Sequence, residues 1–163
     1  MKRKLFTLML ILCFVAGLTL TAYAATGHLV DDAGLLTNTD AANLETKLSQ
    51  ISDRYNVDVV IVTVDSTDGK SPMDFADDYY DYNGYRTDGI LLLVSMEDSD
   101  WWVSTTGYGI TAITDAGLDY MSDRFVLYFS DGEFAEGFDA FADLCDEFLA
   151  QAKTGDPYPL LPS

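Results

Sequence analysis

The sequence is poor in the residues from which most catalytic and metal centres are built. Its only histidine is His28, close to the start of the chain, and its only cysteines are Cys13 and Cys145. A zinc site needs several histidine or cysteine ligands, and a serine or cysteine nucleophile needs a histidine base. We expect His28 to lie on a mobile end of the chain. No catalytic residue and no disulfide framework is therefore predicted.

Basic residues are also scarce, because 9 Lys and Arg stand against 27 Asp and Glu, giving a formal net charge of −18. A surface of this sign repels nucleic acid and anionic lipid, so we expect no nucleic-acid partner. It attracts metal ions and basic protein surfaces, or else the carboxylates only keep the protein soluble. Hydrophobic residues make up 48% of the chain, which predicts a folded domain.

The first 24 residues have the pattern of a secretory signal peptide. The basic run Lys2-Arg3-Lys4 is followed by an uncharged apolar stretch over 5–22, and Ala22-Tyr23-Ala24 has small residues where signal peptidase cleaves. The alternative is an uncleaved membrane anchor, because the apolar stretch is long enough to span a bilayer. We predict cleavage after Ala24 and a secreted or extracytoplasmic protein. Losing the three basic residues makes the net charge three units more negative.

The next segments predict a helix and then a buried strand. Thr37-Asn38-Thr39-Asp40 has the form of a capping box. Apolar residues follow at helical spacing: Ala41, Leu44, Leu48, Ile51 and Tyr55. Residues 57–64 are almost all β-branched, which indicates a strand covered on both faces of its sheet.

A second helix and a β-hairpin follow. Ser71-Pro72 starts the helix, with proline at its first position, and Asn83-Gly84 ends it. Residues 89–95 and 101–106 read as strands joined by a short acidic turn, so they should form an antiparallel hairpin. The adjacent Trp101 and Trp102 should point to opposite faces of the sheet.

Two more helices complete the domain. Thr114-Asp115 should start the first, and Ser130–Glu133 reads as a capping box for the second. The last helix carries a stripe of core residues: Phe134, Phe138, Phe141, Cys145 and Phe148. Cys145 should therefore be an inert buried thiol. We predict an α/β fold with a small mixed sheet between helical layers (α/β/α), spanning residues 25–154, with an irregular tail over 155–163.

Three acidic positions lie on loops between these elements: Asp31, Asp88 and Asp115. Carboxylates from separate loops can converge on a hard cation such as Ca²⁺, which takes six to eight oxygen ligands. The sequence has neither an EF-hand loop, nor a Walker loop, nor the Rossmann glycine pattern, so no nucleotide cofactor is predicted.

Four segments in order resemble the motifs of the TPM domain family. They are residues 30–37 (VDDAGLLT), 88–94 (DGILLLV), 106–115 (TGYGI followed by TD) and 129–134 (FSDGEF). The resemblance covers about residues 29–153 and implies a small α/β/α sandwich. It also implies an extracytoplasmic domain, often tethered to a membrane, with members linked to photosystem repair, receptor accessory roles, acid phosphatase activity and Ca²⁺ binding.

Carried over by position, the family's acidic loop residues fall on Asp31, Asp88 and Asp115. The family commonly has Asp-Asn-Gly before the second strand, whereas this chain has Thr87-Asp88-Gly89, so that carboxylate is shifted by one place. Many relatives carry a transmembrane helix after the domain. This sequence reaches Ser163 without one, so we expect free secretion or an anchor that lies outside it.

Three functions are compatible with these features. The first is a non-catalytic accessory domain for envelope or membrane proteins that binds Ca²⁺ through Asp31, Asp88 and Asp115. The second is a protein-interaction domain without metal. The third is a metal-dependent acid phosphatase, for which Arg86 and Lys70 are the available loop cations and solvated surface charge is their alternative role.

Overall fold

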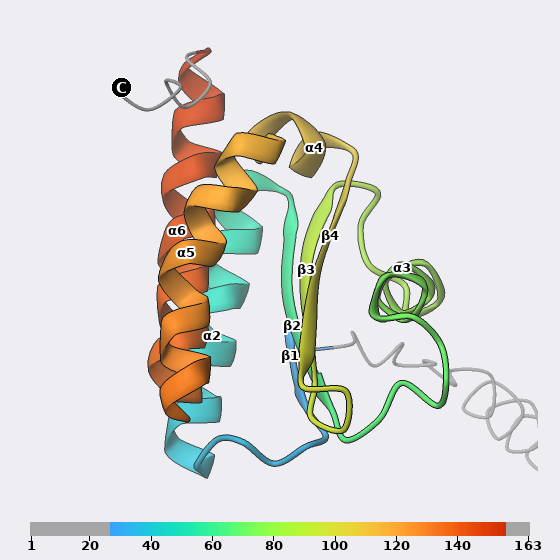
Figure 1. Cartoon of the computed structure of the whole chain (residues 1–163). Helices are drawn as coiled ribbons and strands as arrows, with labels where there is room; N and C mark the ends of the chain where they lie inside the picture. Colours follow the sequence, from blue (N-terminus) through green and yellow to red (C-terminus); the bar gives the residue numbers. More distant parts are fainter. Residues whose placement is uncertain (1–26, 156–163) are drawn as a thin grey trace, which may run out of the picture.

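A mixed sheet of four strands forms the centre of the computed structural model, which describes residues 27–155 (Figure 1). The strands lie in chain order. The first three strands run parallel to one another, and the fourth runs antiparallel to the third. The strands are β1 (Leu29–Asp31), β2 (Asp58–Val64), β3 (Gly89–Ser95) and β4 (Asp100–Thr106).

Helices cover both faces of this sheet, which confirms the predicted α/β/α sandwich (Figure 1). The helices are α2 (Asn38–Tyr55), α3 (Pro72–Tyr82), α4 (Tyr108–Ala112), α5 (Asp115–Asp131) and α6 (Phe134–Thr154). Three of them, α2, α5 and α6, lie on one face, and α3 alone lies on the other. Within residues 27–155, no helix is long and apolar enough to cross a membrane.

Side-chain caps start three of these helices at the predicted positions. The hydroxyls of Thr37, Ser71 and Thr114 accept hydrogen bonds from backbone amides in the first turn of α2, α3 and α5. Each cap satisfies an amide that has no partner within its helix. The β2 strand is buried along its whole length, as its β-branched sequence predicted.

The core is divided unequally by the sheet. On the side of α2, α5 and α6, a ladder of phenylalanines links the last two helices to the sheet, with Phe125 in edge-to-face contact with Phe141 and Trp101. On the other side, Ala76 and Tyr80 of α3 pack on alternate residues of β2 and β3. The two tryptophans point to opposite faces, as expected.

The last helix lies beside the first, although they are far apart in the sequence (Figure 1). The Lys47 ammonium of α2 lies 2.7 Å from carboxylate oxygens of Asp139 and Asp143, and the Arg54 guanidinium lies 2.7 Å from Asp146. These pairs are mostly exposed, so the buried stripe of α6, and not these charges, supplies most of the contact energy.

One predicted cap is wrong, and two short elements were not predicted. The capping box predicted at Ser130 is wrong: α5 continues to Asp131, the Ser130 hydroxyl donates to the Val126 carbonyl, and α6 begins after Glu133 without a side-chain cap. The short strand β1 and the one-turn helix α4 were not predicted. The tail over 156–163 and the signal segment lie outside the described residues.

Candidate functional site

Asp31 lies at the end of β1, where its carboxylate closes the turn that leads to α2. One oxygen accepts a hydrogen bond from the Leu35 amide at 3.0 Å, and the other accepts from the Leu36 amide at 2.9 Å. The Thr63 hydroxyl, on the neighbouring strand, donates to the same carboxylate. This carboxylate therefore already accepts from three donors, two in its own turn and one on β2.

Asp88 lies at the other end of the sheet, directly before β3. Its Oδ1 accepts a hydrogen bond from the Tyr108 amide at 2.7 Å, which holds the start of α4 against the loop. The preceding Gly107 has φ 55°, and a Cβ there would lie 2.1 Å from that same oxygen. The glycine loop is thus shaped around Asp88, which explains why glycine stands at this position.

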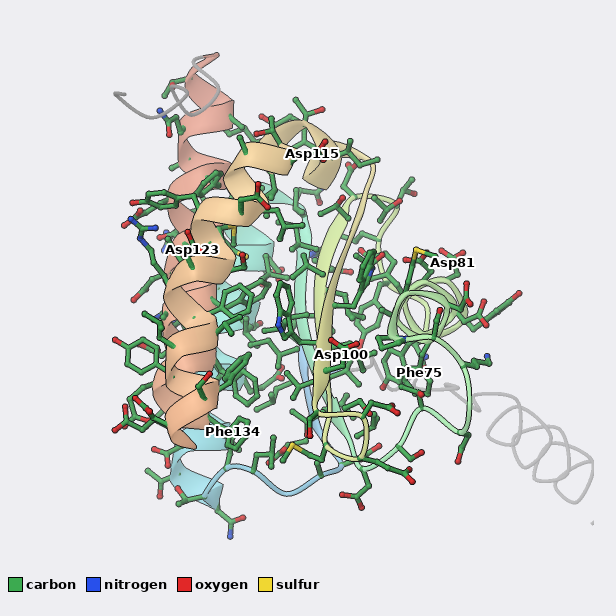
Figure 2. All side chains as sticks on the ribbon, in the orientation of Figure 1. Phe75, Asp81, Asp100, Asp115, Asp123 and Phe134 are labelled. Carbon is green, nitrogen blue, oxygen red and sulfur yellow. The ribbon has the colours of Figure 1, made fainter. Side chains whose placement is uncertain are left out.

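Asp115 is exposed in the first turn of α5, at the same end of the molecule as α4 (Figure 2). A carboxylate in the first turn is favourable, because the amides at a helix N-terminus carry partial positive charge. Asp88 and Asp115 therefore share one end of the sheet.

The structure does not bring the three predicted ligands together. Asp31 is level with Thr63 of β2, whereas Gly89, next to Asp88, is level with Asp58. Five residues of extended strand separate these levels by roughly 16 Å. Ca²⁺ ligands lie within about 2.6 Å of the ion, so a single ion cannot contact both Asp31 and Asp88. Among the described residues, no three histidine, cysteine or acidic side chains are grouped to hold a metal ion.

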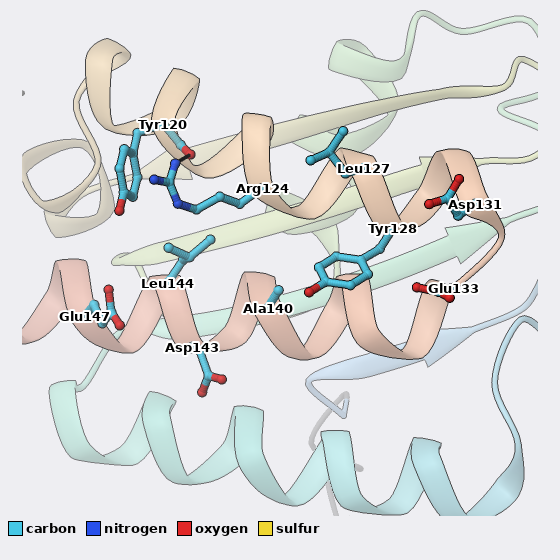
Figure 3. Close-up of a pocket in the computed structure, with 10 residues that line it drawn as sticks. All are labelled: Tyr120, Arg124, Leu127, Tyr128, Asp131, Glu133, Ala140, Asp143, Leu144 and Glu147. Carbon is cyan, nitrogen blue, oxygen red and sulfur yellow. Dashed lines mark hydrogen bonds between the residues drawn. The ribbon is translucent and has the colours of Figure 1, made fainter.

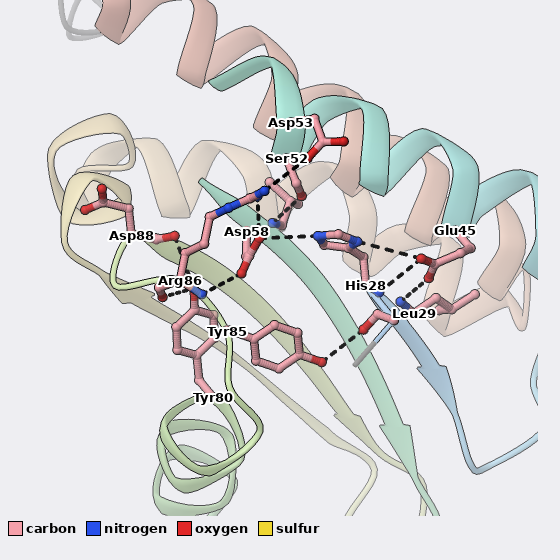
Figure 4. Close-up of polar contacts among 12 residues, drawn as sticks. His28, Leu29, Glu45, Ser52, Asp53, Asp58, Tyr80, Tyr85, Arg86 and Asp88 are labelled. Atoms are coloured by element: carbon pink, nitrogen blue, oxygen red, sulfur yellow. Dashed lines mark hydrogen bonds and ion pairs between the residues drawn. The ribbon is translucent and has the colours of Figure 1, made fainter. Parts of the chain in front are cut away.

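A cluster of charged side chains crosses the N-terminal end of the parallel strands (Figure 4). At its centre is Asp58, whose side chain is 8% exposed. Its carboxylate accepts from the Arg86 guanidinium at 2.7 Å, from the Arg86 amide at 2.6 Å and from His28 at 3.3 Å. Burial alone would raise the pKa of Asp58, but hydrogen bonds from His28 and Arg86 and their charges hold it below its usual value.

His28 is fixed in this cluster, so the prediction of a mobile end is wrong. Its ring bonds to Asp58, and the Glu45 carboxylate of α2 accepts from the amides of His28 and Leu29 at 3.2 and 2.7 Å. The hydrogen bond to Asp58 raises the pKa of His28; the Glu45 charge adds to this, while partial burial and Arg86 oppose it. The arrangement clamps the start of β1.

The residues considered for chemistry are occupied elsewhere. Arg86 is paired with Asp58 and, at 3.0 Å, with Asp53, and the Lys70 ammonium lies 2.7 Å from Asp78. Cys145 is fully buried in the Phe stripe, and burial raises the pKa of its thiol well above the usual range. A buried neutral thiol is unreactive, as the sequence predicted.

A groove of about 660 Å³ lies between α5 and α6, and we call it the helical groove (Figure 3). Exposed apolar side chains lie within it, with Leu127 67% and Tyr128 37% exposed. Its lining comprises Tyr120, Arg124, Leu127, Tyr128, Asp131, Glu133, Ala140, Asp143, Leu144 and Glu147. The groove thus combines an apolar floor with an acidic rim.

The charge of the helical groove is strongly negative. Four carboxylates line it, of which Asp143 is paired with Lys47 of α2, and Arg124 is the one cation in its lining. The Arg124 guanidinium lies 3.2 Å from the centre of the Tyr120 ring and donates to the Tyr120 carbonyl at 2.7 Å, so its position is set by its own helix. The sequence analysis missed this site. The signal was present as apolar residues on the outer face of α5, at Leu127 and Tyr128, which core packing does not require.

Comparison with known proteins agrees with this architecture. A family model described as TPM domain matches residues 29–148. Among curated proteins, none matches the chain.

Three solved structures share the fold. The N-terminal domain of a protein from P. gingivalis is 24% identical, with a TM-score of 0.68, covering 82% of this chain and 88% of that one. The N-terminal domain of cg2496 from Corynebacterium glutamicum is 16% identical, with a TM-score of 0.61 and coverage of 90% and 93%. BA42 from Bizionia argentinensis is 20% identical, with a TM-score of 0.59 and coverage of 71% and 82%.

Proposed function

The chain belongs to the TPM domain family, and from this we propose that it is a non-catalytic accessory domain that works outside the cytoplasm and binds a basic amphipathic segment of an envelope protein in the helical groove. The observation that carries the proposal is the exposed apolar floor of that groove inside an acidic rim. Exposed apolar patches with a polar rim mark interaction sites on soluble domains.

The shape of the helical groove favours a helical partner. A groove between two packed helices receives a third amphipathic helix through apolar anchors spaced at three and four residues. Leu127 and Tyr128 would contact those anchors, while Asp131, Glu133 and Glu147 would face basic residues on the flanks of the partner. The charge of −18 would raise the rate of encounter with a basic segment at low salt.

A phosphatase receives less support from the geometry. Phosphate chemistry needs cations that can turn toward the substrate. The two candidate cations on loops, Arg86 and Lys70, are both engaged in ion pairs. The sole histidine is held between Asp58 and Glu45. The helical groove supplies one arginine and four carboxylates, which would repel a phosphate.

The test is binding of a basic amphipathic helical peptide made of leucine and lysine, followed by NMR chemical-shift mapping. We expect the largest shifts in α5 and α6, and Glu147→Lys should weaken binding by about tenfold. The matched control is Asp81→Lys, which makes the same change of charge on an exposed residue of α3, across the sheet (Figure 2). Equal weakening by both variants would mean that the peptide responds to net charge alone, and would overturn the proposal.

Calcium binding is a separate proposal, motivated by the acidic loops. Of the three expected ligands, Asp88 and Asp115 share one end of the sheet, so we place the ion there. A ligand that binds only the native state raises the melting temperature. We expect excess Ca²⁺ after EDTA to raise it, Asp115→Ala to remove most of the shift, and Asp31→Ala to lower the baseline yet keep the shift. A melting curve that millimolar Ca²⁺ leaves unmoved would contradict this.

A further inference from the structure

The outer edge of β4 is the second surface with an unexplained apolar character. Sheet order places β4 at the edge, and within residues 27–155 no further strand pairs with it. An open strand edge presents amide and carbonyl groups that can pair with another chain. Whether this edge can accept a partner depends on which of its backbone groups point outward.

The hydrogen-bond pattern identifies those groups. The Met96 amide, just after β3, donates to Val64 of β2. Because amides alternate along a strand, those of Ser95, Leu93 and Leu91 face β4. Their partners there are Asp100, Trp102 and Ser104. The residues between these point their amides outward: Trp101, Val103 and Thr105. In agreement, the Trp101 amide donates to the Asp100 side chain at 2.8 Å.

A groove of about 480 Å³ runs along this edge and has apolar walls on both faces of the strand. Trp101 lies on the α5 side with Leu118, and Trp102 lies on the α3 side with Met73. Trp102 is 39% exposed and Met73 is 44% exposed. An extended segment paired with β4 would place alternate side chains over these two walls.

We propose that the outer edge of β4 accepts an extended segment of another protein as an additional strand, with apolar side chains over Trp101 and Trp102 and a basic residue beside Asp100. Val103, at the middle of the strand, would exchange both of its backbone hydrogen bonds with the segment. This site is separate from the helical groove: α5 contributes to both, but the two grooves share no lining residue.

Charge decides what kind of segment fits. Asp100 lines the groove, and Asp77 of α3, which accepts from the Ser104 hydroxyl, lies beside it. The neighbouring cation, Lys70, is already paired with Asp78. A second copy of the chain would bring another charge of −18 to the same edge, so edge-to-edge pairing of two copies is opposed by repulsion. A basic segment removes this cost.

The tail of the chain itself is a poor occupant. In an extended tail Pro157 and Pro159 remove amides from one edge, and Pro162 interrupts the other edge. The only charged residue of the tail is Asp156, so the tail has no basic residue to place beside Asp100. A segment of another protein with lysine or arginine and β-branched residues satisfies both the backbone and the charge.

Tryptophan fluorescence tests the proposal directly, because Trp101 and Trp102 are the only tryptophans in the chain. The probe is a peptide of about nine alternating valine and threonine residues with a lysine at each end. Methylation of every second backbone nitrogen keeps one edge of the peptide free to pair and prevents self-association. We expect this peptide to shift the emission of the full chain to shorter wavelength. The same peptide methylated at every nitrogen should have no effect.

Amide exchange locates the binding edge without a mutation. In the free protein the amides of Val103 and Thr105 should exchange much faster than those of Trp102 and Ser104. The peptide should slow Val103 exchange by about tenfold or more at saturation. A Val103 amide that is already protected in the free protein, or that the peptide leaves unchanged, would overturn the proposal.

A variant gives an independent check. Thr105→Pro removes one outward amide and leaves the ladder to β3 intact, so we expect a folded protein that binds the peptide about tenfold more weakly. Leu127→Ala in the helical groove is the control and should leave peptide binding unchanged. Equal binding by the Thr105 variant, or loss in the Leu127 variant, would contradict strand addition at β4. Because the two grooves are tested by different variants, failure of one proposal is distinguishable from failure of the other.

Discussion

The two edge strands of the sheet differ in length and in how their outward backbone groups are paired. The β1 edge is three residues long, and the β4 edge is seven. At each edge a carboxylate accepts from an outward amide: Glu45 from Leu29, and Asp100 from Trp101. Both edges therefore use a carboxylate to accept from an outward amide, but the two edges differ in how many outward amides remain without an acceptor.

At β1 side-chain carboxylates accept the outward amides, so we call this the closed edge and the β4 side the open edge. Glu45 accepts from both His28 and Leu29, and β1 ends at Asp31, whose own carboxylate accepts from the following turn. At β4 the single Asp100 carboxylate leaves Val103 and Thr105 without a side-chain acceptor or donor among the described contacts. In this sheet the length of the edge strand, and not the presence of a charge on it, decides whether the edge is closed. Two pairs of variants, and one variant compared with the wild type, test this contrast.

The largest effect is expected at the closed edge, from Asp58→Ala. The change leaves Arg86 and His28 without their shared buried acceptor, and we expect a loss of about 2 to 3 kcal/mol in the free energy of unfolding. Urea denaturation measures this. Asp53→Ala removes the other, 70% exposed partner of Arg86 and should cost under about 0.5 kcal/mol. Similar losses in both variants would mean that burial of the cluster contributes little.

An intermediate difference in the free energy of unfolding is expected between variants of the two edge carboxylates, Glu45 and Asp100. Glu45→Ala leaves the amides of His28 and Leu29 without their acceptor and should cost about 1 to 2 kcal/mol. Asp100→Ala exposes one amide to water at an open edge and should cost under about 0.5 kcal/mol. The two variants should be compared in one set of denaturation curves. A larger loss at Asp100 would reverse the assignment of closed and open edges.

The smallest effect is a pH dependence at the closed edge. Because Asp58 raises the pKa of His28 in the folded state, the stability that His28 contributes is complete below about pH 6.5 and is lost as pH rises through the folded pKa. Relative to His28→Gln, the wild type should lose under about 1 kcal/mol between pH 6 and pH 9. The charges of Glu45 and Arg86 also act on the ring. A constant difference between the two proteins would contradict a titrating His28.

The lowered pKa of Asp58 predicts a loss of stability in acid. The stability that Asp58 contributes is present above its unfolded pKa near 3.9 and is lost as pH falls through its folded pKa. The closed edge should therefore weaken in acid as well.

Most of the fold was predictable because its elements carry strong local signals. The apolar stripe of α2, the β-branched run of β2 and the caps at Ser71 and Thr114 each fix one element. The failures are elements whose stability comes from elsewhere. The β1 strand is too short for a pattern and is held by Glu45, and α4 is held by Asp88. The capping pattern at Ser130 failed because α5 continues past Ser130 and ends at Gly132, which adopts the left-handed conformation.

The candidate sites were less predictable than the fold. Sequence reasoning found the acidic loops, yet spacing does not tell which end of a sheet a loop occupies. Asp31 ends one strand and Asp88 directly precedes another that runs parallel to it, so they lie at opposite ends of the sheet once β1 is recognised as a strand. The helical groove and the β4 groove arise from side chains of separate elements. Only the packing of those elements brings Arg124 and Glu147 to one groove, and Met73 and Trp102 to the other.

The position of α6 beside α2 has a consequence for how the chain reaches its native state. The first helix is complete at Tyr55, but its covering helix begins at Phe134. Contacts this distant in sequence must wait for a large loop to close, which slows folding. The apolar stripe of α2 packs on β2 as well as on α6, so a nascent chain cannot shield it completely until nearly all of the chain has been synthesised. For a protein that we propose is exported, this delay would keep the polypeptide unfolded, and so able to be threaded through a translocation channel, until its last helix is free.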